Sequence, residues 1–279
     1  MPVLKRPARQ VSKASNAKVL KRPAAKNGRP RRRAVDSLVA KLAEVNWVPL
    51  ESNPDMLNVF ARHIGLPEEW RFVDVLGVDA EFLSMVPRPV LGVTLLFQCS
   101  EKLLEHNYEQ QTLIKKSGQK LKDDTFFMKQ YVGNACGTIA AIHCIANSAE
   151  KMGVASDSAV GQLLTRTRGL SPEEIGAQLA DMEEFHLASD ESAAGGQTEA
   201  PEAEEDTDHH FISFVAVDGD IYELDGAKPF PINHGPAGDD MLEAVANVIK
   251  AEFMEKDPGN IHFNVMALVK STEDADACS

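Results

Sequence analysis

The chain has 279 residues with 43% hydrophobic content, enough to bury the core of one large domain or of two small ones. Its four cysteines follow no metal-ligand spacing, which favours a reducing compartment without structural disulfides. No apolar run reaches the ~18 residues of a membrane span, and no secretory signal is recognisable, so the sequence predicts no membrane insertion. The net charge of −13 is divided unevenly. Residues 1–36 carry +11, from 12 Lys and Arg against one acid, and residues 37–279 carry −24, from 17 Lys and Arg against 41 acids.

Residues 1–36 form a basic N-terminal extension with almost no large side chains, so we expect it to be disordered. Its basic clusters at 21–22 and 31–33 are separated by eight residues and resemble a bipartite nuclear localisation signal. Non-specific nucleic-acid contact and a plain solvated tail are the alternatives. We expect the protein to be cytoplasmic, with nuclear entry as an option through this extension, and no nucleic-acid binding outside it.

Regular structure is predicted from about residue 46 onward. Asn53, Pro54 and Gly65 are typical of the N-cap, the first position and the end of a helix. Further helices are expected over 101–117, 137–147, 171–186 and 239–256. Strands are expected over 72–77, 90–99, 211–217, 221–225 and 261–270. The mixture predicts an α/β or α+β fold, with one central sheet covered by helices.

Cys136 lies where one of the predicted helices begins. The N-terminus of a helix stabilises a thiolate, and Gly137 would let a substrate carbonyl approach the backbone closely. A buried, purely structural cysteine is the alternative. Cys144, inside the same helix, is expected to belong to the core, and Cys99 and Cys278 are assigned no role.

The dipeptide at 218–219, Asp-Gly, predicts a two-residue β-hairpin. In the register that this turn sets, His210 and Asp225 lie on the same face of the sheet as diagonal neighbours, with Cα atoms ~7–8 Å apart. His210 could then donate one ring N–H to Asp225 and offer its other nitrogen to the thiol of Cys136. His209 points to the opposite face. A strand-edge histidine beside a chance acid is the alternative.

A thiol that attacks a carbonyl also needs hydrogen-bond donors for the oxyanion that forms. The backbone N–H of Cys136 is one candidate donor. The side chain of Gln130, six residues upstream, is a second one, and an ordinary surface glutamine is the alternative.

Residues 187–208 contain eight acids and no Lys or Arg. A structureless loop of this length inside a compact domain is usually functional or disordered. A solvated insertion is the alternative interpretation.

Four regions of the folded part carry specific motifs: MKQYVGNACGTIAAIHCIANS, GQTEAP, HFISFVAVDGDIYELDGAKPFPINHG, and WVPLESNP followed by LSMVPRPV. Together they resemble the ubiquitin C-terminal hydrolases, a family of papain-like cysteine deubiquitinases. The resemblance covers about residues 46–270. It implies a compact, single catalytic domain over 37–279, in which a mainly antiparallel sheet is flanked by helices and the backbone is knotted. It also implies that no metal or organic cofactor is needed.

The resemblance implies a role for each candidate site residue. Cys136 would be the nucleophile, His210 the general base and acid, Asp225 the carboxylate that orients His210, and Gln130 the oxyanion donor. Residues 187–208 would form a crossover loop that admits small or extended adducts of ubiquitin. The expected partner is ubiquitin, whose basic face an acidic domain would attract. A hydrolase for a ubiquitin-like modifier such as NEDD8 and a catalytically dormant ubiquitin-binding protein are the alternatives, and we expect a monomer.

Overall fold

The computed structural model describes residues 39, 42, 45–196 and 208–271, and the basic extension 1–36 lies outside this part of the chain. One six-stranded sheet forms the centre, in the order β1-β6-β2-β3-β4-β5, and every neighbouring pair is antiparallel. The strands are β1 (Trp70–Asp74), β2 (Val90–Gln98), β3 (His209–Val217), β4 (Asp220–Leu224), β5 (Ile232–Pro236) and β6 (Phe263–Lys270).

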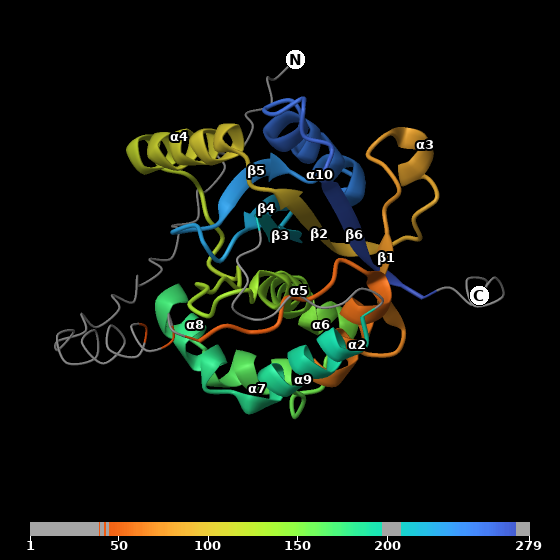
Figure 1. The fold of residues 1–279 in the computed structure, drawn as a ribbon, viewed down its shortest axis with the longest axis vertical. Coiled ribbons are helices and arrows are strands. Elements are labelled where there is room, and N and C mark those ends of the chain that lie inside the picture. The colour runs from red at the N-terminus through yellow and green to blue at the C-terminus, as the bar shows by residue number, and fades with distance from the viewer. Residues whose placement is uncertain (1–38, 40–41, 43–44, 197–207, 272–279) are drawn as a thin grey trace, which may run out of the picture.

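Helices cover both faces of this sheet (Figure 1). One layer contains α2 (Pro54–Ile64), α5 (Cys136–Asn147), α6 (Ala149–Met152), α7 (Ala159–Arg166), α8 (Pro172–Ala180) and α9 (Glu183–Ala194). The other side holds α3 (Ala80–Leu83), α4 (Glu101–Ser117), α10 (Met241–Ile249) and the π-helical turn η1 (Lys250–Met254). The predicted fold class, a mainly antiparallel sheet flanked by helices, is therefore confirmed. The knot that the resemblance implies depends on a chain path that includes 197–207, outside the described residues.

The alternation of β3 explains why the sheet needs two helical layers. Phe211 and Val215 belong to the core cluster around α5, while Ile212 and Phe214 belong to the cluster around α10. Successive side chains of a strand point to opposite faces, and here both sets are apolar. Helix α5 is itself buried all round from residue 137 to residue 146, as its lack of a polar face predicts.

The predicted ends of α2 are confirmed. The side chain of Asn53 accepts a hydrogen bond from the N–H of Asp55, and Gly65 ends the helix in the left-handed conformation with φ of 110°. The first strand is shifted, since it spans 70–74 instead of 72–77. Strand β5 was not predicted, because its sequence INHGP contains the glycine, proline and polar residues that usually break strands.

The helix predicted over 171–186 is in fact two helices, α8 and α9, separated by an extended Met182 (φ −98°, ψ 99°) whose side chain is buried. The start of the predicted crossover loop is also wrong, because 187–194 belong to α9. The buried residues of this stretch share the i, i+3, i+4, i+7, i+8 spacing of a helix face: Phe185, Ala188, Ser189, Ser192 and Ala193. Most of these buried residues are small, so the amino-acid composition of this stretch resembles that of a linker. Residues 197–207 of the predicted loop lie outside the described residues.

In the part of the chain that the structure describes, no helix combines the length and the apolarity that crossing a bilayer demands.

Candidate active site

Cys136 is the first residue of α5. The loop before it is fixed by a hydrogen bond from the N–H of Trp47 to the carbonyl of Gly133 (3.0 Å). Asn134 then takes a left-handed conformation with φ of 57°, and Ala135 is fully buried, so the chain enters the helix in one defined direction. The Cys136 thiol therefore lies where the first N–H groups of a helix lack partners and favour an anion.

His210 is brought to the same place by the β3–β4 hairpin. The hairpin has the predicted register, with Val217 opposite Asp220 across a two-residue turn. Asp225 directly follows the last residue of β4, diagonal to His210. On its other side β3 pairs with β2, where Phe97 lies opposite His210 and its ring meets the imidazole edge-on, with centroids 6.0 Å apart. The imidazole is therefore held between a carboxylate and an aromatic ring.

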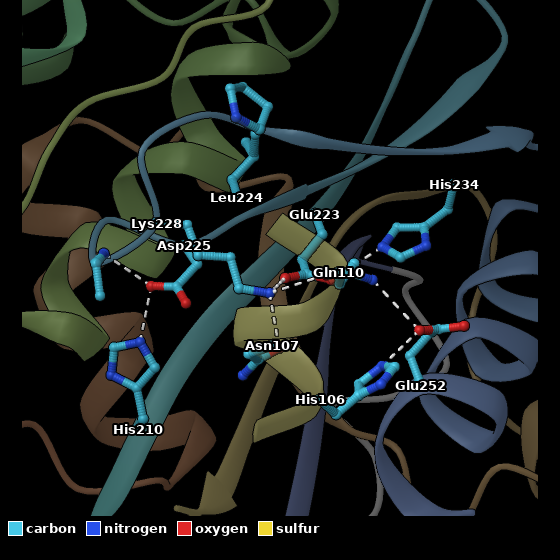
Figure 2. A network of polar contacts seen from close by, with 12 residues as sticks. His106, Asn107, Gln110, His210, Glu223, Leu224, Asp225, Lys228, His234 and Glu252 are labelled. Carbon is cyan, nitrogen blue, oxygen red and sulfur yellow. Dashed lines mark hydrogen bonds and ion pairs between the residues drawn. The ribbon is translucent and has the colours of Figure 1, made fainter. Parts of the chain in front are cut away.

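His210 and Asp225 form a direct pair (Figure 2). The Nε2 of His210 lies 2.8 Å from Oδ1 of Asp225, and the same oxygen accepts a hydrogen bond from the N–H of Ala227 at 2.8 Å. Only 5% of the Asp225 side chain is exposed, so water competes little for this carboxylate. His209 instead contacts the exposed carboxylate of Asp208 at 2.9 Å. The geometry agrees with the predicted choice of His210 over His209.

The thiol of Cys136 lies close enough to the imidazole of His210 for the two groups to interact, and this interaction lowers the pKa of the thiol. Since Nε2 of the imidazole is already taken by Asp225, the ring nitrogen left for the thiol is Nδ1. The three side chains thus stand in the order thiol, imidazole, carboxylate, which is the arrangement of a cysteine nucleophile with its base and an orienting group.

Charge interactions within this group shift all three pKa values in the direction that favours an ion pair. Burial raises the pKa of the Cys136 thiol, but the imidazole of His210 and backbone hydrogen bonds outweigh it and lower that pKa. Burial lowers the pKa of His210, yet Asp225 and Cys136 raise it well above 6.5. Burial raises the pKa of Asp225, while His210, Lys228 and the N–H of Ala227 lower it to about 2. The site therefore stabilises a thiolate beside an imidazolium.

Gln130 lies next to the turn that follows Asp225, because its N–H donates to the carbonyl of Gly226 at 3.0 Å. Its side-chain Nε2 donates to the carbonyl of Val132 at 3.1 Å, which fixes the direction of the amide. An amide nitrogen has two N–H donors, so one is left for a ligand. The structure thus places Gln130 beside the turn that follows Asp225, and its role as an oxyanion donor stays a prediction.

Gly137 also lies at a tight packing contact, which the sequence did not predict. A Cβ atom there would come within 3.2 Å of Leu50 Cβ and of Phe211 Cδ2. Both neighbours are buried core residues. The absence of a side chain therefore favours close packing of α5 against the core, and the expected approach of a substrate carbonyl stays a prediction.

The remaining described cysteines differ from each other. Cys144 is fully buried, and burial raises its pKa to about 12, so it is a core residue as predicted. Cys99 was assigned no role, but it lies close enough to interact electrostatically with His210 and Cys136. Burial raises the pKa of Cys99, and its N–H donates to the carbonyl of Asp208 at 2.6 Å. Cys99 is therefore a neutral thiol beside the site.

Two residues that contact His210 or Asp225 are not identified by the sequence analysis. Phe97 belongs to β2, and only the pairing of β2 with β3 brings it to His210. Lys228 follows Asp225 by three residues and is 4% exposed. A lysine between apolar residues in AKPFP was an available signal for burial, since lysines are rarely buried without a partner.

Among the described residues no group of three or more His, Cys, Asp or Glu side chains could hold a metal ion.

Known proteins resemble this chain over most of its length. A family model described as ubiquitin carboxyl-terminal hydrolase, family 1, matches residues 47–255. The probable ubiquitin carboxyl-terminal hydrolase of Dictyostelium discoideum is 42% identical over 226 residues, which are 81% of this chain and 88% of the relative. Human ubiquitin carboxyl-terminal hydrolase isozyme L1 is 38% identical over 223 residues, 80% of this chain and 98% of the relative.

A solved structure shares the fold. The UCH37 catalytic domain of Trichinella spiralis, bound to ubiquitin vinyl methyl ester, superposes with a TM-score of 0.65. The alignment covers 84% of this chain and 100% of that domain, at 22% sequence identity. At this identity the match supports the arrangement of the sheet and its helices.

Proposed function

Because the chain belongs to ubiquitin carboxyl-terminal hydrolase family 1, we propose that it is a cysteine-type deubiquitinase. Its reaction would be hydrolysis of the bond between the C-terminal glycine of ubiquitin and a small or extended adduct. The observation that carries the proposal is the position of the His210 imidazole, which contacts Asp225 through Nε2, has its other nitrogen left, and lies close enough to the Cys136 thiol to lower the pKa of that thiol.

The geometry supports a two-step acyl transfer. His210 takes the thiol proton on Nδ1, and Sγ of Cys136 attacks the carbonyl carbon of the ubiquitin glycine. His210 then gives this proton to the leaving amine, so that a thioester and a free amine form. In the second step His210 takes a proton from water as the water oxygen attacks the thioester carbon, and it returns this proton to the leaving sulfur of Cys136. The ubiquitin carboxyl group and the free thiol are then released. Asp225 keeps the imidazole in one orientation throughout.

Each step passes through an oxyanion, for which two donors are available. The backbone N–H of Cys136 is at the start of α5, and Gln130 has one amide N–H that is not used by Val132. We expect Gln130→Ala to lower kcat about 10²-fold, while KM changes by less than about threefold, because the lost hydrogen bond forms only in the transition state. Steady-state hydrolysis of a fluorogenic ubiquitin C-terminal amide measures both. An unchanged kcat would remove Gln130 from the oxyanion site.

The direct test of the proposed function is turnover by the wild-type chain. A ubiquitin C-terminal amide that releases a fluorophore should be hydrolysed without added metal, and a ubiquitin vinyl methyl ester should add covalently to Cys136. The same assay with a NEDD8 amide is run in parallel. Absence of turnover and of labelling would contradict the proposal, and faster turnover of the NEDD8 amide would assign the site to that modifier instead.

The charge of the chain fits this partner. Residues 37–279 carry −24, and a strongly acidic domain attracts a basic protein surface and speeds the encounter. Between exposed charges this attraction is screened within ~10 Å at 0.1 M salt. The rate of association with ubiquitin should therefore fall as salt is raised.

For localisation we propose a cytoplasmic protein whose basic extension, residues 1–36, allows nuclear entry. The two clusters at 21–22 and 31–33 support this proposal by their charge and spacing. A chain that starts at residue 37, with a fluorescent tag, is expected to lose nuclear signal relative to the full chain. Equal nuclear signal for both would show that the extension is not a targeting segment.

A further inference from the structure

Lys228 is a buried cation in the turn between β4 and β5. Its side chain is 4% exposed, and its Nζ forms an ion pair with Glu223. The same nitrogen donates to Oδ1 of Asn107 at 2.9 Å and lies 3.4 Å from Oε1 of Gln110 (Figure 2). An ammonium group has three N–H donors, and each finds an acceptor here. The side chain is therefore held in one place by three separate groups.

Glu223 is a matching buried anion. One of its oxygens contacts Lys228, and the other lies 2.9 Å from Nε2 of His234. Burial raises the pKa of Glu223, but Lys228 and His234 outweigh it and lower the pKa to about 2. Glu223 therefore stays ionised through the neutral range, and Lys228 keeps its counter-charge.

The network extends to a second carboxylate and joins four elements. Glu252 of η1 accepts hydrogen bonds from His106 (2.8 Å) and from Gln110 (3.3 Å), both on α4. Figure 2 shows the contacts running from α4 to β4, β5 and η1. The charged or titratable groups that surround the lysine are therefore Glu223, which it contacts directly, Asp225, whose pKa it lowers, and His234, His106 and Glu252 beyond Glu223. Such a network fixes the position of the Lys228 side chain relative to α4, β4, β5 and η1.

The backbone of the same turn belongs to the active site. The N–H of Lys228 donates to the carbonyl of Asp225 at 2.9 Å, and the N–H of Ala227 donates to the Asp225 carboxylate at 2.8 Å. Between them, the carbonyl of Gly226 accepts the N–H of Gln130 at 3.0 Å. Residues 225–228 thus form one turn, which contacts the Asp225 carboxylate through the N–H of Ala227 and contacts Gln130 through the carbonyl of Gly226.

We propose that Lys228 is a positioning residue that acts through Asp225. Its buried side chain holds the turn, and the turn holds the Asp225 carboxylate against Nε2 of His210. This inference deepens the proposed function and rests on it, because the roles of Asp225 and His210 belong to that proposal. Among the described residues, the side chain of Lys228 bonds to Glu223, Asn107 and Gln110, and not to the thiol of Cys136.

The first test is Lys228→Met, which keeps the length of the side chain and removes its donors. We expect kcat for the ubiquitin amide to fall about tenfold, with KM changed less than about threefold, because a displaced carboxylate misorients the general base and leaves ubiquitin binding intact. The matched control is Lys250→Met, which removes an exposed lysine paired with Asp79 and should keep kcat within about twofold. An unchanged kcat in a folded Lys228→Met protein would overturn the proposal.

A second readout needs no ubiquitin, so it separates this proposal from the proposed function. The rate of Cys136 alkylation by iodoacetamide follows the thiolate fraction. Without a held Asp225 the imidazolium is less stabilised, so the pH of half-maximal alkylation should rise by about half a unit or more in Lys228→Met. It should stay unchanged in Lys250→Met. A fall in kcat without this rise would mean that Lys228 does not act through the triad, and would overturn the proposal.

Two double variants exclude a merely structural role. Glu223→Leu with Lys228→Met removes both charges, and a buried ion pair can often be replaced by apolar residues without loss of stability. The proposal expects kcat to stay low in this variant, and recovery to the wild-type value would overturn it. In an Asp225→Asn background, Lys228→Met should cost less than about twofold further, since the two act as one unit. A further tenfold loss of kcat in this background would mean that Lys228 acts independently of Asp225, and would overturn the proposal.

Discussion

Cys136→Ala is expected to abolish hydrolysis of a ubiquitin C-terminal amide, with a loss in kcat on the order of 10⁴-fold or more. The reason is that Sγ of Cys136 forms the thioester, and no other described thiol can replace it. Cys99 and Cys144 both have raised pKa values, and Cys144 is fully buried. Ubiquitin binding should be retained, because alanine fits the first position of α5 and the contact surface is unchanged.

The measurement pairs turnover of the amide with a direct binding assay on the same variant. Cys144→Ala is the matched control, since it removes the other cysteine of the same helix. It should keep kcat, at a cost in stability of about 1 kcal/mol for the small void. Substantial turnover by Cys136→Ala, or covalent labelling of that variant by ubiquitin vinyl methyl ester, would contradict the assignment of the nucleophile.

The pairing of His210 with Asp225 could be predicted from the sequence because it depends on local rules. A two-residue Asp-Gly turn fixes the register of a hairpin, and the period of two along a strand fixes which side chains share a face. The structure has that register, with Val217 opposite Asp220. The position of Cys136 at the start of a helix could also be predicted locally, from the apolar run that follows it in the sequence.

The surroundings of the pair depend on contacts between distant segments, which no local rule provides. Phe97 reaches His210 only through the pairing of β2 with β3, and Asn107 reaches Lys228 from a helix more than a hundred residues away in sequence. Helix α9 was missed for a different reason. Its buried face consists largely of Ala and Ser, so the hydrophobic signal for a helix is weak there, although the buried residues have helical spacing.

His210→Ala is expected to lower kcat on the order of 10³-fold, because the imidazole serves as base toward the thiol and as acid toward the leaving amine. The variant should also change the pH dependence of Cys136 alkylation. In the wild-type protein His210, together with backbone hydrogen bonds, offsets the effect of burial and lowers the pKa of the thiol. Without the imidazole, the pH of half-maximal alkylation should rise to about 8.5 or above, the range of an ordinary or buried thiol.

Asp225→Asn separates the two pKa shifts in the pH–rate profile. The thiolate–imidazolium pair exists between the lowered pKa of Cys136 and the raised pKa of His210, so wild-type activity should cover neutral pH and fall at higher pH, where the imidazolium loses its proton. An asparagine removes the charge that raises the pKa of His210. The alkaline limb of kcat/KM should therefore move to lower pH in this variant, while the control Lys250→Met keeps the wild-type profile. An alkaline limb that does not move would mean that Asp225 is not the group that keeps His210 protonated.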